Sequence, residues 1–252
     1  MTLDIDVLSL FPAMLEGPLA ASIPGRIQDQ GLATIRIHDL RRWGLGRHRS
    51  VDDAPYGGGA GMVLRPEPVA AALDELRSSD STVILLDAAG LPFDQARAGD
   101  LAGRPHLILV CPRYEGVDER IRSLVDIEIS IGDYVLTGGE LPALVIIDAI
   151  IRLLPGAIDE ASTAEESFAA GLLEYPQYTR PPAFRGEGIP AILASGDHEA
   201  VRRWRLRESL RRTLERRPDL LEHRALSREE AALLEEVSSA TPGPGEHGSE
   251  GS

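Results

Sequence analysis

The chain has 252 residues, 43% of them hydrophobic, which is enough for a sizeable core and argues against global disorder. Its single cysteine, Cys111, excludes an intramolecular disulfide framework and a cysteine-based zinc site, and it fits a reducing cytoplasm. The net charge of −14 argues at first sight against a nucleic-acid partner. We expect neither a signal peptide nor a membrane span, because the longest apolar stretch, residues 141–154, is short and interrupted by charges.

Strand-like runs recur through the first 150 residues and alternate with helix-like stretches. The runs occupy residues 3–10, 33–40, 82–87, 106–111 and 126–130. The clearest helix-like stretches are residues 66–79, 116–125 and 141–154. This alternation predicts an α/β fold in which helices cover both faces of a mostly parallel sheet.

Three glycine-bearing loops follow the third, fourth and fifth runs, at residues 87–90, 111–116 and 131–140. Ligands of parallel sheets bind beyond the carboxyl ends of the strands, so the loops predict a cofactor pocket. A Walker loop and a G-x-G-x-x-G after the first strand are both missing, which argues against a standard nucleotide or dinucleotide site. Without a Cys/His cluster, we expect no transition-metal centre either.

The C-terminal part has a different character. Residues 196–236 predict two or three helices, the last of them opened by a capping box between Ser227 and Glu230. Residues 201–217 carry eight arginines against two glutamates, in an otherwise acidic chain. Such a helix is ordinarily a solvated charged face, and Trp204 among the arginines favours a nucleic-acid contact only in combination with the resemblance described next.

Six segments resemble, in one consistent order, the TrmD family of bacterial tRNA (guanine-N1)-methyltransferases. They are SVDDAPYGGGAGM (50–62), CPRYEGVDER (111–120), SIGDYVLTGGE (130–140), YTRP (178–181), SGDH (195–198) and SLRRTLERRPDLL (209–221). The resemblance covers about residues 1–236. It implies a SPOUT methyltransferase domain with a deep trefoil knot at residues 1–157 and a linker at 158–175. A small C-terminal helical tRNA-binding domain would follow at 176–237, and a disordered tail at 238–252.

The resemblance also implies what the protein does. The activity would be methyl transfer from S-adenosylmethionine to N1 of guanosine 37 in tRNA, immediately 3′ of the anticodon. The enzyme would be a cytoplasmic homodimer, with each active site shared between subunits and no membrane contact. A dependence on Mg2+ is implied by the family alone, since the sequence contains no metal-binding motif.

The cofactor-binding residues follow from the same resemblance. In the family, the loop after the fifth strand wraps the adenine and methionine portions, and main-chain groups recognise the adenine edge. By itself, SIGDYVLTGGE is equally typical of a tight turn that caps a helix. The residues implied are Leu85, Leu86, Asp87, Pro112, Tyr114, Glu115, Gly116, Ser130, Ile131, Gly132, Asp133, Tyr134, Val135, Leu136, Gly138 and Gly139. Asp87-Ala88 stands where the family usually has Ser-Pro, and Pro112 where it commonly has glycine.

Methylation at N1 requires a base for the N1 proton and a positive group for the charge that grows on O6. The family's arginine falls on Arg152, and its general base, an aspartate before a Ser-Phe pair, falls on Glu166. Glu165 is the alternative alignment for the base. Without the resemblance, both glutamates would be solvated linker charges, and Arg152 would be a helix-end arginine that complements the dipole.

The expected contacts to tRNA lie in both halves of the chain: Asp53, Tyr56, Glu115, Arg180, His198, Arg203, Arg205 and Arg212. Two other functions stay open. One is a non-catalytic or weakly active RNA-binding relative, against which Arg152 and the carboxylate at Glu166 argue. The other is a methyltransferase of a small heterocycle, which would not need the arginine-rich helix.

Overall fold

The computed structural model describes residues 2–159, 166–168, 171–222 and 224–240. The chain divides into two compact units, residues 1–160 and 161–252. Parts of the expected linker and most of the expected tail lie outside the described residues. The last described helix includes residues 238–240, where the tail was expected to begin.

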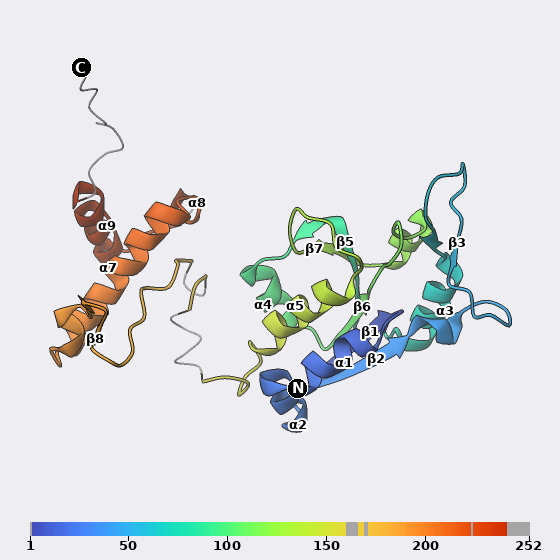
Figure 1. The fold of residues 1–252 in the computed structure, drawn as a ribbon, viewed down its shortest axis with the longest axis horizontal. Helices are drawn as coiled ribbons and strands as arrows, with labels where there is room; N and C mark the ends of the chain where they lie inside the picture. The colour runs from blue at the N-terminus through green and yellow to red at the C-terminus, as the bar shows by residue number, and fades with distance from the viewer. Residues whose placement is uncertain (1, 160–165, 169–170, 223, 241–252) are drawn as a thin grey trace, which may run out of the picture. The chain divides into compact units, whose positions relative to one another are not determined.

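The first unit is built on a parallel five-stranded sheet with the order β2-β1-β6-β5-β7 (Figure 1). Its strands are β1 (Leu3–Ser9), β2 (Ala33–Asp39), β5 (Ser81–Pro92), β6 (His106–Val110) and β7 (Ile127–Ser130). All five predicted strands are therefore confirmed. They form because their apolar, β-branched runs are buried on both faces of the sheet.

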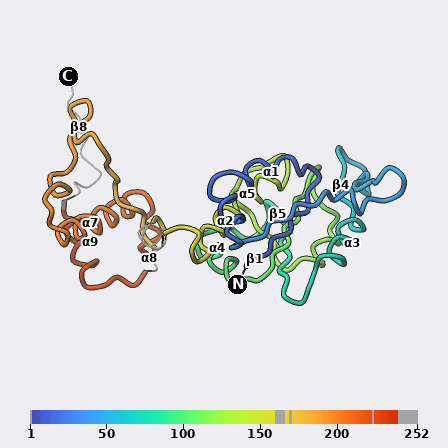
Figure 2. The backbone as a smooth tube through the Cα atoms, turned by 90° about the horizontal axis from the view of Figure 1, so that it is seen from below, coloured from blue at the N-terminus to red at the C-terminus, as the bar shows by residue number. Residues whose placement is uncertain are grey.

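Helices cover both faces, as predicted. One face packs against α1 (Ala13–Ala20), α2 (Ser22–Asp29), α4 (Gln95–Ala102) and α5 (Glu140–Ile151). The other face packs against α3 (Pro66–Leu76) and the 3-10 turns η1 (Leu40–Trp43) and η2 (Glu119–Leu124). Strand β1 contributes side chains to the hydrophobic clusters on both faces of the sheet. Leu3, Ile5 and Val7 pack against the first group of helices, and Leu8 packs against the second. Figures 1 and 2 show the four helices of the first group gathered together, apart from α3.

Several expected elements differ from those observed. The helix expected over residues 116–125 is only the 3-10 turn η2, whose start is capped by the Asp118 carboxylate accepting from the Arg120 amide. Helices α1, α2 and α4 were not expected, since each has eight residues and contains glycine or proline, which mask a helical pattern. The pair β3 (Asp52–Asp53) and β4 (Val63–Leu64) closes the glycine-rich loop between them.

Residues 87–90, expected as a loop after the third strand, lie instead within β5. The pairing of β5 with β7 shifts between Leu86 and Leu91, so the segment bulges and the strand resumes. Gly90 is needed there because a Cβ atom would lie 2.5 Å from the backbone nitrogen of Ile129. The bulge places Asp87 and Ala88 at the carboxyl end of the sheet.

The described part of the second unit is mainly helical. It contains the short pair β8 (Ala183–Phe184) and β9 (Glu187–Gly188), the turn η3 (Ala191–Ala194), and the helices α7 (His198–Arg216), α8 (Asp219–Glu222) and α9 (Arg228–Ala240). Leu172, Leu210 and Leu233 form its core. The predicted capping box is confirmed, because the Glu230 amide donates to Ser227 Oγ (3.2 Å) and the Ser227 amide donates to the Glu230 carboxylate (2.7 Å).

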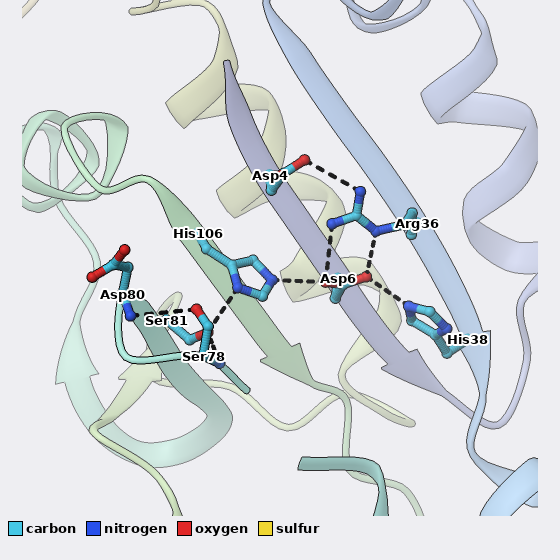
Figure 3. Close-up of polar contacts among 8 residues, drawn as sticks. All are labelled: Asp4, Asp6, Arg36, His38, Ser78, Asp80, Ser81 and His106. Carbon is cyan, nitrogen blue, oxygen red and sulfur yellow. Dashed lines mark hydrogen bonds and ion pairs between the residues drawn. The ribbon is translucent and has the colours of Figure 1, made fainter. Parts of the chain in front are cut away.

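A buried carboxylate in the middle of β1 crosslinks three strands of the sheet (Figure 3). Asp6 on β1 accepts hydrogen bonds from Arg36 Nε (2.9 Å) and His38 Nε2 (2.6 Å) on β2, and from His106 Nε2 (2.7 Å) on β6. Burial by itself raises the pKa of Asp6. The hydrogen bonds from His38, Arg36 and His106 together outweigh that effect and hold the pKa well below its ordinary value.

The lowered pKa of Asp6 predicts an acid-dependent contribution to stability. The native state binds this proton less readily than the unfolded chain, so the stabilisation is complete above the unfolded pKa of about 4 and is lost as the pH falls below it. We expect Asp6→Asn to lower the free energy of unfolding at pH 7 by about 2 kcal/mol, and the gap to narrow steadily as the pH falls below the unfolded pKa of about 4. Urea titrations followed by circular dichroism measure both quantities.

Asp4→Asn is the matched control for Asp6→Asn. Asp4 bonds the same Arg36 (3.2 Å), but its side chain is 44% exposed. We therefore expect a change below about 0.5 kcal/mol for this variant. Equal stability of Asp6→Asn and wild type at pH 7 would contradict the assignment.

Candidate functional site

The three predicted glycine-bearing segments meet at the carboxyl end of the sheet and enclose a pocket. Its volume is about 220 Å³, and its lining comes from residues 86–88, 112–116, 129–132, 134–139 and Pro142. The first segment is the bulge within β5, and the other two follow β6 and β7; these three strands are adjacent in the sheet order. The pocket therefore lies where a parallel sheet ordinarily binds its ligand.

Most residues expected to bind a cofactor line this pocket, and Leu85 and Asp133 do not. Leu85 is fully buried in the core beneath the sheet. Sequence reasoning missed Arg113 and Thr137, which also line the pocket. Arg113 lies inside the CPRYEG segment, so its position in the predicted loop was the available signal.

The glycine pair at the end of the third segment is required by close packing of the chain on itself. A Cβ atom on Gly139 would lie 2.6 Å from Cys111 Cα and 2.7 Å from Pro112 Cδ. A Cβ atom on Gly138 would lie 2.3 Å from Arg113 Nε. The Gly139 amide also donates to the Pro112 carbonyl (2.9 Å). The segment after β7 thus crosses directly over the segment after β6.

A fully buried carboxylate locks that crossing. Glu140, the first residue of α5, accepts from Ser9 Oγ at the end of β1 (2.7 Å) and from Arg113 Nε (2.8 Å). Arg113 also donates to the Thr137 carbonyl (3.1 Å), and its guanidinium lies 4.5 Å from the centre of the Phe11 ring. Glu140 thus joins its own segment to those of Ser9 and Arg113. The charge-assisted hydrogen bond from Arg113 compensates for the burial of the carboxylate.

Four consecutive main-chain donors remain available at the pocket. The amides of Val135, Leu136, Thr137 and Gly138 have no hydrogen-bond acceptor in the described part of the chain. The Gly139 amide, by contrast, is bonded to Pro112. Polar main-chain groups need a partner, so this row of donors suits a ligand with several acceptor atoms, or water in its absence.

Two titratable groups near the pocket stay protonated at neutral pH. Burial, with the neighbouring charge of Glu140, raises the pKa of the Cys111 thiol well above its ordinary value. Burial, with the charge of Asp52, raises the pKa of the Tyr114 phenol. Cys111 is thus no nucleophile, and Tyr114 remains a hydrogen-bond donor.

The residues expected to contact substrate in the first unit are divided between the pocket and a nearby loop. Glu115 lines the pocket, and its amide donates to the Met62 carbonyl (3.0 Å), which ties the glycine-rich loop to the pocket. Asp53 pairs with Arg65 (3.0 Å), and Tyr56 is fully exposed on that loop. Neither Asp53 nor Tyr56 lines the pocket.

The two expected catalytic residues belong to different units. Arg152 directly follows α5 in the first unit and is half-buried. Glu166 is a half-buried residue of the second unit, and a turn follows it in which the Glu174 amide donates to Ser167 Oγ (3.0 Å). Glu165, the alternative alignment, lies outside the described residues.

The arginine-rich helix is closer to electrical neutrality than its sequence suggests. Arg202 pairs with Glu199 and with Glu229 on α9 (both 2.7 Å), and Arg203 pairs with Glu236 on α9 (2.8 Å). Glu229 and Glu236 lie outside residues 201–217, so a charge count over that segment overstates the positive charge of the helix.

The other four residues expected to bind tRNA lie in four different environments within the second unit. Arg212 donates to the Glu174 carbonyl (3.2 Å), and the Arg205 guanidinium lies 4.8 Å from the centre of the Tyr175 ring. His198 is the exposed first residue of α7. Arg180 lines a second, more open pocket of about 740 Å³ within the second unit.

Neither a metal site nor a membrane span is found where the structure describes the chain. Across those residues, no group of three His, Cys, Asp or Glu side chains could hold a metal ion. No described helix is long and apolar enough to cross a membrane.

Comparison with known proteins connects this geometry to a family. The model described as tRNA (Guanine-1)-methyltransferase TrmD matches residues 3–223. A tRNA (guanine-N(1)-)-methyltransferase of Chloroflexus aggregans is 56% identical over 239 residues, which are 92% of this chain and 94% of the relative. A protein of the same name from Dictyoglomus turgidum is 53% identical over 236 residues, 93% of this chain and 96% of the relative.

A third relative of that name, from Limosilactobacillus fermentum, is 52% identical over 240 residues, 92% of this chain and 95% of the relative. Alignments that cover 92% or more of this chain necessarily span both units and the three segments of the pocket. The resemblance seen in six short motifs thus extends to nearly the whole chain, and the chain belongs to the TrmD family of tRNA (guanine-N1)-methyltransferases.

Proposed function

We propose that this chain transfers the methyl group of S-adenosylmethionine to N1 of guanosine 37 in tRNA, immediately 3′ of the anticodon. The observation that carries the proposal is the pocket at the carboxyl ends of β5, β6 and β7, in a chain that matches the TrmD family over residues 3–223. The relatives described above are named as tRNA (guanine-N(1)-)-methyltransferases, which supports the proposal.

The pocket residues suit S-adenosylmethionine. Its adenine and carboxylate supply the acceptors that the amides of Val135, Leu136, Thr137 and Gly138 lack, and apolar side chains such as Ile131 can enclose the adenine. When bound, the cofactor supplies a methyl group on a positively charged sulfur. We assign its binding to the expected residues that line the pocket, and we leave Leu85 and Asp133 out of direct contact.

We further infer that the first unit has the SPOUT fold with its trefoil knot. Strand β7 lies at one edge of the sheet, beside β5, yet the helix that follows it packs against α1 and α4. To reach that position, the chain passes directly over Cys111 and Pro112, where a Cβ atom on Gly139 has no room. Such a crossing is what threading of the C-terminal segment requires.

In this mechanism the chain's own residues move one proton and stabilise one charge. Glu166 takes the N1 proton as general base, and Arg152 stabilises the negative charge that grows on O6. The Glu140–Arg113 pair holds the cofactor segment in place, so that the methyl group stays aligned with N1. A glutamate at this position reaches about 1 Å further than the family's aspartate, so the turn after Glu166 must accommodate the added length.

We propose that the active enzyme is a homodimer in the cytoplasm with a shared active site. Phe11, Met14, Leu141 and Val145 are exposed apolar residues next to or on α1 and α5, two helices that pack together. A cluster of this kind is typical of a protein interface. In a shared site, Glu166 of one subunit would serve the pocket of the other.

The helical domain at residues 176–237 would bind tRNA through Arg180, His198, Arg203, Arg205 and Arg212, and Asp53 and Tyr56 would contact the RNA near the pocket. Because Arg203 is paired with Glu236, a phosphate must compete with a carboxylate at this position. Among the described residues, Arg212 donates to a carbonyl oxygen and pairs with no carboxylate, so it is the stronger candidate for a direct phosphate contact.

The assignment of the base predicts the effect of three substitutions on methyl transfer. We expect Glu166→Gln to lower kcat about 100-fold or more, because the amide cannot accept the N1 proton. Arg152→Ala should lower kcat by a similar factor, because the charge on O6 is no longer stabilised. The measurement is transfer of labelled methyl from S-adenosylmethionine to unmodified tRNA with guanosine at position 37.

Glu165→Gln is the matched control, since it removes the neighbouring carboxylate and should leave kcat nearly unchanged. A loss with Glu165→Gln and none with Glu166→Gln would move the base by one residue. If wild type binds cofactor and tRNA without transfer, the chain is an RNA-binding relative. Transfer to free guanosine but not to tRNA would identify a methyltransferase of a small heterocycle.

The close crossing at Gly139 predicts a structural route to loss of cofactor binding. Gly139→Ala places a methyl group against Cys111 and Pro112, so the segment after β7 must shift. We expect the Kd for S-adenosylmethionine, measured by calorimetry, to rise about 10-fold or more. Gly99→Ala in α4 is the control, because a Cβ atom there meets nothing within 4 Å and the helix gains propensity.

The proposed dimer predicts that a charge on the outer surface of α5 separates the subunits. Val145 is 49% exposed, so Val145→Glu should fold normally, yet it would bury an unpaired carboxylate in the interface. Light scattering should give the mass of a monomer for this variant and of a dimer for wild type. Leu45→Glu, at an exposed apolar residue that belongs to neither α1 nor α5, should stay dimeric. A wild-type monomer would refute the shared site.

A further inference from the structure

Asp87 brings a fixed negative charge to the pocket. It lies in the bulge of β5 and is one of the lining residues, and its side chain is only 19% exposed. Its carboxylate accepts hydrogen bonds from Arg122 Nη2 (2.8 Å) and from the Ala89 amide (2.8 Å). These two bonds hold the carboxylate at the edge of the pocket.

The single positive charge of Arg122 does not balance the negative charges of the carboxylates that surround it. Arg122 also pairs with Glu119 (3.0 Å) and with Glu128. Three carboxylates therefore share one positive charge, which leaves a formal surplus of two negative charges. Glu119 is 85% exposed and well screened by solvent, whereas Asp87 and Glu128 are largely buried.

The other charges of the pocket do not offset this surplus. Among the lining residues, all of which the structure describes, Arg113 is the one cation, and its charge is compensated by the buried Glu140. Glu115 adds a second lining carboxylate. The pocket is thus electrostatically suited to a cation.

We propose that Asp87, held by Arg122, makes the pocket selective for S-adenosylmethionine over S-adenosylhomocysteine, the product of transfer. This inference rests on the methyltransferase function proposed above. In that reaction, the N1 lone pair forms the new C–N bond, the N1 proton passes to the base, and the electron pair of the S–CH3 bond stays on sulfur. The bound molecule thereby loses one positive charge.

The loss of that charge weakens the attraction to Asp87 at the moment of transfer. The pocket therefore holds the substrate form of the cofactor more tightly than the spent form, and release of the product is favoured. For a partly buried carboxylate that lines the pocket, discounted for solvent screening, we expect a contribution to selectivity of roughly 5- to 10-fold.

The test compares three ligands by isothermal titration calorimetry. S-adenosylmethionine and sinefungin, which has a protonated amine at the position of the sulfonium, are cationic there, and S-adenosylhomocysteine is neutral there. For Asp87→Asn we expect the Kd of both cationic ligands to rise roughly 5- to 10-fold, and the Kd of S-adenosylhomocysteine to change little. Glu119→Gln is the matched control, because it removes a charge from the same Arg122 outside the pocket, and it should leave all three values nearly unchanged.

Asp87→Ser is the second variant. Its hydroxyl can still accept from the Ala89 amide, so the bulge keeps one bond even if Asp87→Asn proves unstable in thermal denaturation. Equal weakening of all three ligands by either variant would mean that Asp87 binds a group they share, and it would overturn the proposal, as would no weakening at all. If wild type binds none of the ligands, the methyltransferase function itself fails first.

Discussion

The buried Glu140 carboxylate is the interaction on which the candidate site depends. It lies between Ser9 at the end of β1 and Arg113 in the segment after β6, and it begins α5. A carboxylate buried to this degree is stable only while both partners remain in place. Three segments distant in sequence are thereby held at one point, and the pocket opens beside that point.

The same point explains the glycines of the third segment. Gly138 and Gly139 pass so close to Arg113, Cys111 and Pro112 that no side chain fits. The main-chain amides of residues 135–138, just before this close passage, have no hydrogen-bond acceptor in the described chain. Donors that the fold already aligns need less ordering when a ligand binds, which lowers the entropy lost on binding. Both the packing of the protein and the proposed binding of the cofactor therefore require a backbone without bulky side chains at the glycine pair.

The two units differ in how their arginines are paired with carboxylates. In the first unit, Arg113 is compensated by Glu140, while Arg122 leaves negative charge around Asp87. In the second unit, carboxylates of α9 offset arginines of α7. An acidic cofactor pocket suits a cationic methyl donor, and paired arginines favour RNA only where phosphates outcompete carboxylates. Each unit is thus suited to one of the two substrates in the proposed reaction.

The sequence was enough to predict the five parallel strands, because long apolar runs between turns have few alternatives to a buried sheet. It also determined the capping box of Ser227 and Glu230, whose partners are three residues apart. The convergence of the three glycine-bearing segments at one edge of the sheet was also predictable from the parallel strands. Tertiary structure alone decided the bulge in β5, the short helices rich in glycine and proline, and the partners of Glu140 and Arg203. Ser9 and Glu140 are 131 residues apart, and no local pattern encodes a contact that exists only once the sheet has brought its strands together.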